Sequence, residues 1–168
     1  MFRKSIVAAL LVGALATSAV ADAPQPIALD PITHNTGALV ITRADGTEVR
    51  YTPAELERLD TYRLRTTTPW RDEPADFDGV LLSDLLQLNG LADLDEVQVI
   101  AENDFVSSFP RALWETVPVL IATRVDGQPH SRRERGPIQF VISQDDFTAS
   151  DLASEAHLVW MVARIEPE

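Results

Sequence analysis

The residues best suited to bind a ligand form a short basic segment at positions 130–135. This segment contains His130 and three arginines, Arg132, Arg133 and Arg135. Guanidinium groups hold phosphate, sulfate or carboxylate groups through paired, charge-assisted hydrogen bonds. The segment therefore predicts a site for a small anion. The same residues are also compatible with a solvated loop whose charges pair with nearby carboxylates.

A second basic set, Arg63, Arg65 and Arg71, lies around the loop that contains Trp70. Arg63 and Arg65 are two positions apart, so their side chains lie on the same face of a strand. Two guanidinium groups on one face could converge on the same anion as the first segment. The alternative is a solvated strand face, with Trp70 covering the edge of the core. Together the two sets give the candidate anion-binding residues Arg63, Arg65, Trp70, His130, Arg132, Arg133 and Arg135.

Other kinds of chemistry have no motif in this chain. There is no glycine-rich phosphate loop, no H-E-x-x-H and no G-x-S-x-G. The absence of cysteine excludes disulfides, thiolate metal ligands and thiol nucleophiles. The three histidines, 34, 130 and 157, are too far apart in the sequence to predict a metal site. We therefore assign no catalytic residue and no metal ligand from the sequence.

The charge balance limits the classes of partner. The 168 residues include 14 Lys+Arg and 26 Asp+Glu, which gives a formal net charge of -12. Nucleic acids and anionic membranes bind proteins through clustered positive charge, so neither is an expected partner. We expect a small anionic ligand or a periplasmic protein as the partner.

The first residues have the order of a secretory signal. Arg3 and Lys4 precede an apolar run and the small residues Ala19-Val20-Ala21. We expect a signal peptide at residues 1–21, export to the periplasm, and no membrane insertion after cleavage. The proline-rich residues 22–37 predict an extended arm, and residues 38–168 predict one domain.

The domain alternates short strands and short helices without a regular βαβ repeat, which predicts a compact α+β fold with a mixed sheet. A hairpin around Asp45-Gly46 and a helix capped by Thr52 open it. Apolar periodicity predicts a helix over residues 80–88, and acidic residues predict another over 145–156. The expected strands are 61–68, 97–101, 105–109, 117–125, 138–142 and 157–165, with a loop at 69–74 and helical turns at 110–115.

Five segments in the correct order resemble the oxidoreductase molybdopterin-binding domain, the sulfite-oxidase-type fold. The run from Phe77 through Gly79 to Leu91 resembles that family's "GV-L-DLL…GL" segment. The other four are residues 102–110 ("DGY-S-P"), 119–129 ("LLA…NG-PL"), 135–142 ("HG-P-R-VVP") and 160–166 ("W…IEV"). The resemblance covers about residues 38–166 and is to small periplasmic members of the family.

The resemblance implies a molybdenum held by a pterin dithiolene and by one protein cysteine. That cysteine would lie near Thr66 to Thr68, where this chain has only threonine. Arg135 replaces the family's histidine, and Gln139 replaces its arginine. A chain of this length is also too short to enclose a large pterin fully. We therefore expect no bound cofactor. If a cofactor is bound, the resemblance implies that it is molybdopterin.

The function we expect is that of an exported domain without redox catalysis. It would bind a small anion or a partner protein, as a sensory or accessory subunit. The alternative is a molybdopterin-dependent oxidoreductase in which the position of the protein ligand is vacant or is filled by an oxygen of Thr66, Thr67 or Thr68.

Overall fold

The computed structural model describes residues 23–33 and 37–168. The expected signal peptide, residues 1–21, lies outside the described residues. In the described residues no helix is long and apolar enough to cross a membrane.

Two β-sheets form the domain. The first has the strand order β1-β4-β5-β8-β10, with β9 added beside β8, and the second has the order β3-β2-β11-β6-β7. The strands are β1 (Gln25–Ile27), β2 (Leu39–Thr42), β3 (Glu48–Tyr51), β4 (Thr61–Thr68), β5 (Arg71–Leu81), β6 (Glu96–Ala101), β7 (Val106–Pro110), β8 (Leu120–Val125), β9 (Gln128–Pro129), β10 (Gln139–Val141) and β11 (Val162–Pro167). Strand β11 pairs with β2 in parallel and with β6 antiparallel, so the second sheet is mixed.

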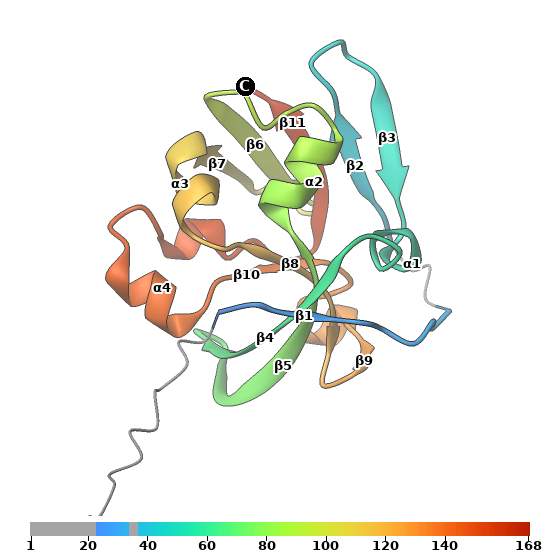
Figure 1. Cartoon of the computed structure of the whole chain (residues 1–168), viewed down its shortest axis with the longest axis vertical. Helices are drawn as coiled ribbons and strands as arrows, with labels where there is room; N and C mark the ends of the chain where they lie inside the picture. Colours follow the sequence, from blue (N-terminus) through green and yellow to red (C-terminus); the bar gives the residue numbers. More distant parts are fainter. Residues whose placement is uncertain (1–22, 34–36) are drawn as a thin grey trace, which may run out of the picture.

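The helices are short and lie between strands. They are α1 (Pro53–Leu56), α2 (Leu82–Leu88), α3 (Arg111–Thr116) and α4 (Gln144–Ala149), with 3-10 helices η1 (Arg132–Glu134) and η2 (Glu155–His157). In Figure 1 the first sheet fills the lower half of the molecule and the second sheet the upper half, with α2 and α3 in front. This arrangement confirms the predicted compact α+β fold with mixed strands and short helices.

Local sequence signals explain several elements. Gly46 turns the β2–β3 hairpin with a φ of 82°, and the backbone N–H of Thr47 donates to Asp45. At α1 the Thr52 side chain accepts from the backbone of Glu55, and the Glu55 carboxylate accepts from the backbone of Thr52. Those hydrogen bonds lower the pKa of Glu55. The predicted capping box is therefore present.

Some predicted boundaries were wrong. The predicted helix at 80–88 begins only at Leu82, because Val80 and Leu81 continue β5 and pair with β8. The predicted loop at 69–74 is a two-residue turn, since β5 already begins at Arg71. The predicted helix at 145–156 is α4 followed by a turn and η2.

Two further differences concern the ends of the domain. The last strand begins at Val162, after η2 and a left-handed residue at Met161, whereas the sequence predicted a start at 157. Within the arm, Gln25–Ile27 is extended as expected, but it is also hydrogen-bonded to β4 as β1. The start of the arm is therefore the edge strand of the first sheet.

The main core lies between the two sheets. It takes Ile41, Val99 and Ile165 from the second sheet and Ile121 and Phe140 from the first, all of them buried. The leucines of α2 and α3 close the same cluster. Burial of this apolar surface is the main force that holds the sheets together.

The close approach of β5 to β8 requires a glycine at position 79. A Cβ at Gly79 would lie 1.9 Å from the carbonyl oxygen of Ile121, and the register of the two strands shifts between Asp78 and Gly79. Only a residue without a side chain allows this approach. The close pairing holds β8 in the middle of the first sheet.

A buried ion pair joins β8 to the connection between α1 and β4, which links the two sheets. Arg124 on β8 donates from Nε to Oε1 of Glu57 (3.0 Å) and from Nη2 to Oε2 (2.6 Å). Glu57 directly follows α1, which follows strand β3 of the second sheet. Arg124 also donates to the carbonyl oxygen of Asp30, and the hydroxyl of Thr123 donates to Glu57. Both charged side chains are about 5% exposed or less.

Replacing one member of this pair should destabilise the fold strongly. In Glu57→Gln the guanidinium of Arg124 stays buried without a counter-charge, which costs about 3–5 kcal/mol. Urea denaturation followed by circular dichroism measures the loss.

Arg164→Ala is the matched control, because it removes an ion pair to Glu48 whose side chains are about half exposed. Such a pair contributes about 0–1 kcal/mol. Equal losses in the two variants would contradict the role given to the buried pair.

Candidate functional site

A pocket of about 210 Å³ lies between the β4–β5 turn and the loop that joins β9 to β10. We call it the polar pocket. Its lining residues are Thr68, Trp70, Arg71, Phe77, His130, Arg133, Glu134, Arg135 and Gln139. The pocket therefore brings together four of the seven predicted residues, from two segments that are 60 positions apart in the chain.

Arg135 and Trp70 form one wall of the polar pocket. The Cζ atom of Arg135 lies 4.6 Å from the centroid of the Trp70 ring, which is a cation–π contact. Arg135 ends η1 in the left-handed region, with a φ of 78°. Its backbone donates to Arg132 and accepts from Met161, and these bonds hold the residue in place.

The charges of the polar pocket are not balanced. Arg71 faces Asp126 at 3.7 Å and Glu134 at 3.5 Å. Among the described residues, Arg133 has no hydrogen-bond or ion-pair partner, and the side chain of Arg135 has only the contact with Trp70. Two guanidinium groups of the polar pocket thus remain unpaired in a protein of strongly negative charge.

His130 adds a buried imidazole to the lining of the polar pocket. The residue is 5% exposed, and its Nε2 lies 2.8 Å from Oε1 of Gln139. An amide oxygen only accepts, so Nε2 carries the proton in the neutral ring and Nδ1 is an acceptor. Within residues 23–33 and 37–168, Nδ1 has no partner. Burial lowers the pKa of His130, against the opposing effect of the Gln139 hydrogen bond.

The other three predicted residues do not line the polar pocket. Arg63 and Arg65 lie opposite Asp78 and Asp76 on the neighbouring strand. Arg63 donates to both oxygens of the fully buried Asp78, at 2.7 and 2.9 Å, and this bond raises the pKa of Arg63. Arg65 donates to Asp76 at 2.9 Å. These two arginines are therefore held by acidic partners within their own hairpin.

Arg132 is likewise paired outside the polar pocket. Two of its guanidinium nitrogens donate to the carboxylate of Glu102, with an Nη2–Oε1 distance of 2.8 Å. The structure instead adds Arg71 and Gln139, which were not among the candidates. Arg71 belongs to the second basic set of the sequence, but no sequence signal ties Gln139 to His130.

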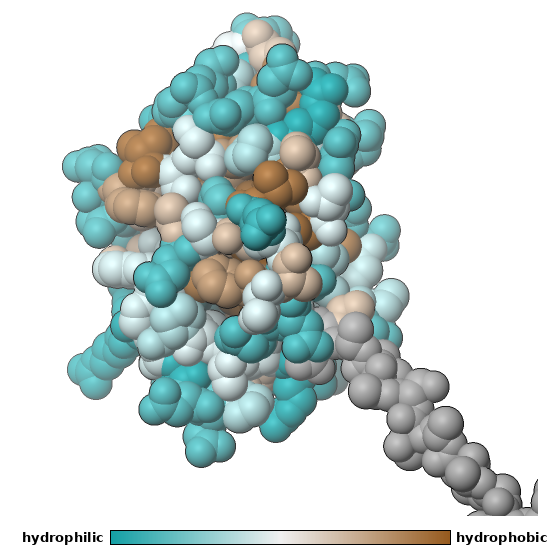
Figure 2. All heavy atoms as spheres, turned by 90° about the vertical axis from the view of Figure 1, so that its left-hand side faces the viewer, coloured by the Kyte–Doolittle hydropathy of each residue, from teal (hydrophilic) through white to brown (hydrophobic). Residues whose placement is uncertain are grey.

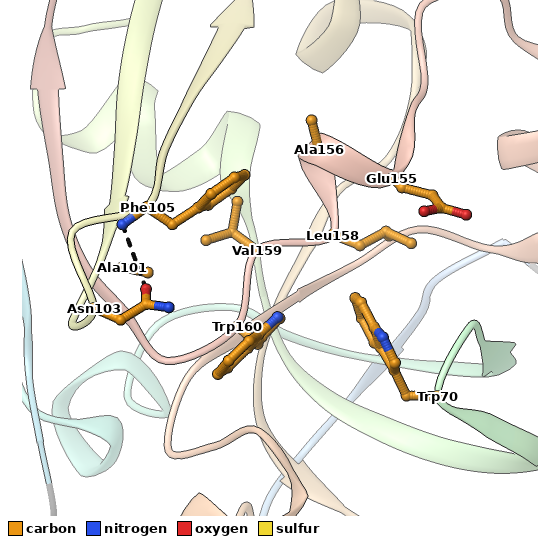
Figure 3. A pocket seen from close by; sticks show the side chains of 9 residues that line it. All are labelled: Trp70, Ala101, Asn103, Phe105, Glu155, Ala156, Leu158, Val159 and Trp160. Carbon is orange, nitrogen blue, oxygen red and sulfur yellow. Dashed lines mark hydrogen bonds between the residues drawn. The ribbon is translucent and has the colours of Figure 1, made fainter.

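An apolar pocket of about 340 Å³ also has Trp70 in its lining. Its lining residues are Trp70, Ala101, Asn103, Phe105, Glu155, Ala156, Leu158, Val159 and Trp160 (Figure 3). Trp70 is the one residue common to the linings of the two pockets. The two compartments therefore meet at a tryptophan.

The donor set does not suit a molybdenum held by a thiolate. The chain has no cysteine, and at the predicted ligand position Thr66 is 3% exposed. Its hydroxyl oxygen accepts from the backbone N–H of Gln144 at 3.0 Å. The described residues contain no group of three or more His, Asp or Glu side chains arranged to hold a metal. The polar pocket is also smaller than the roughly 300–1,000 Å³ usual for small-molecule sites.

Comparisons with known proteins support the fold alone. No protein-family model and no curated protein matches the chain. Among solved structures, it is similar to the sulfane dehydrogenase SoxCD from Paracoccus pantotrophus, with a TM-score of 0.60 at 14% sequence identity. The match covers 83% of this chain and 40% of the SoxCD chain. The domain thus has a sulfite-oxidase-like fold, and it spans well under half of that matched chain.

Stability should fall as the pH drops below about 6.5. Burial lowers the pKa of His130 and of His157 from 6.5, so the unfolded chain takes up these protons first. The stability contributed by the neutral rings is complete above pH 6.5 and is lost as the pH falls toward their folded-state pKa values.

Urea midpoints at pH 7.5 and pH 5.5 measure this loss. In His130→Gln the difference between the two midpoints should shrink, because one of the two buried rings is gone. A midpoint that stays constant or rises on acidification would rule the effect out.

Proposed function

We propose that this protein is an exported, non-redox domain that binds a small anion in the polar pocket. The observation that carries the proposal is the pair of unpaired arginines, Arg133 and Arg135, in the lining of the polar pocket. In so acidic a protein, guanidinium groups that lack a carboxylate partner and line one pocket favour an anionic ligand.

The placement of Arg135 supports the same proposal. A non-glycine residue in the left-handed region costs about 1–3 kcal/mol, and such residues gather at ligand sites. Here that conformation sets the guanidinium over Trp70, next to Arg133 in the pocket lining. Two neighbouring guanidinium groups suit a planar carboxylate or a tetrahedral oxyanion.

The absence of redox catalysis is proposed from the ligand chemistry. No residue of the chain can supply a thiolate, and the hydroxyl of Thr66 already serves the backbone of Gln144. Export to the periplasm is proposed from the residue order of positions 1–21. Recognition of a partner protein in a sensory or accessory complex stays a prediction from the sequence.

Anion binding should depend on Arg133 and Arg135. Isothermal titration calorimetry in low-salt buffer, with sulfate, phosphate and acetate as probes, measures it. Loss of each charged hydrogen-bond donor costs about 1.5–3 kcal/mol, so Arg133→Ala and Arg135→Ala should each weaken binding by roughly tenfold or more.

Arg50→Ala is the matched control, because Arg50 is an exposed arginine on β3 in the other sheet. It should leave the affinity unchanged. Equal weakening by all three variants would indicate a general charge effect, and no binding of any probe would overturn the proposal.

The second candidate is a molybdopterin-dependent oxidoreductase without a cysteine ligand, which the sulfite-oxidase-like fold favours. The two candidates differ in metal content. Protein purified from a host that makes the cofactor should contain no stoichiometric molybdenum and no pterin fluorescence. Stoichiometric molybdenum and pterin, lost together in a Thr66→Val variant, would replace the first proposal with the second.

A further inference from the structure

We infer that the anion bound by this protein carries a flat apolar body, so that the ligand is a small aromatic or alicyclic carboxylate. The carboxylate would lie in the polar pocket and the ring in the apolar pocket. This inference rests on the proposed function, since it assigns the ligand class of the same site.

The two pockets adjoin at Trp70, which lines both of them. The guanidinium of Arg135 stacks on the Trp70 ring and belongs to the polar pocket. A carboxylate held by Arg135 would therefore lie within reach of the tryptophan that opens the apolar pocket. A ligand that consists only of a charged group would leave the apolar pocket empty.

The walls of the apolar pocket suit a ring. In Figure 3 Trp70 and Trp160 lie on two sides of the space below Leu158, and Phe105 and Val159 lie together at its other end. These side chains come from the β4–β5 turn, from the β6–β7 turn and from the segment before β11. An apolar cavity of about 150 Å³ binds benzene, so about 340 Å³ is enough for one substituted ring.

Two of these aromatic side chains are exposed although they are large and apolar. Trp70 is 38% exposed and Phe105 is 46% exposed. Figure 2 shows several separate apolar groups among polar and neutral side chains on the face of the molecule that carries α3 and α4. Exposed aromatic groups beside a pocket gain from being covered by a ring, and aromatic pairs favour offset or edge contacts.

The charges of the two linings determine which end of the ligand lies in which pocket. Glu155 is the only charged residue in the lining of the apolar pocket, and it repels a carboxylate there. The unpaired Arg133 and Arg135 attract one in the polar pocket. A cationic ring is disfavoured, because Arg135 already stacks on Trp70.

Calorimetry with acetate, benzoate, cyclohexanecarboxylate and benzyl alcohol tests the inference on the purified protein. Benzoate and cyclohexanecarboxylate should bind at least tenfold more tightly than acetate, and benzyl alcohol should bind more weakly than benzoate. Phe105→Ala and Trp160→Ala should lower the benzoate affinity severalfold and leave the acetate affinity unchanged.

Phe105→Ala is the more robust of the two variants, because Phe105 is half exposed and its loss leaves the core intact. Leu88→Ala is the matched control, since it removes another exposed apolar side chain, on α2, that lines neither pocket. The control should bind benzoate as the unaltered protein does.

The outcomes separate the two proposals. Acetate and benzoate binding equally would overturn this inference and leave the anion site standing. Failure of every carboxylate, with benzyl alcohol bound or not, would overturn this inference, and it would overturn the anion site as well if sulfate and phosphate also fail to bind. Tighter binding of phenyltrimethylammonium than of benzoate would overturn this inference in favour of a cationic ligand at Glu155.

Discussion

The buried ion pair between Arg124 and Glu57 is the constraint on which the arrangement of the domain depends. Two opposite charges that are almost fully buried must stay together, because either one alone would be far less stable than in water. Arg124 lies on β8, and Glu57 follows the helix after β3 of the other sheet. The pair therefore anchors to β8 the α1–β4 connection, through which the chain passes from the second sheet to the first, and the bond to Asp30 adds the N-terminal arm.

Strand β8 transmits this constraint to the candidate site. It pairs with β5, β9 and β10, and the segments that line the polar pocket extend from these strands. Gly79 lets β5 approach β8 closely enough for that pairing. Two loops therefore extend from strands that pair directly with β8 or follow one another beside it. They are the β4–β5 turn with Trp70 and the β9–β10 loop with His130, Arg133 and Arg135. In this way the sheet positions the functional residues that its loops carry.

The electrostatics of the site follow from which arginines have acidic partners. Arg63, Arg65 and Arg132 each have a carboxylate within hydrogen-bond distance, whereas Arg133 and Arg135 have none among the described residues. In so acidic a protein most basic groups find a partner, so an unpaired couple creates a local positive potential. The fold itself does not decide the chemistry. Similarity to SoxCD gives the scaffold, and the residues in the pockets give the function we propose.

The sequence by itself determined the local features. The capping box at Thr52 and Glu55, the Asp45-Gly46 turn and the missing thiolate follow from residue types at fixed short spacings, where neighbouring backbone atoms decide the outcome. The order of motifs also predicted the fold class, because strand and helix patterns survive when sequence identity is low. Only the tertiary structure decided which arginines are free. Arg63 is paired because strand register puts Asp78 opposite it, and Arg135 lies over Trp70 because two loops about 60 residues apart meet. Such contacts depend on pairing across the sheet, which residue spacing along the chain does not specify.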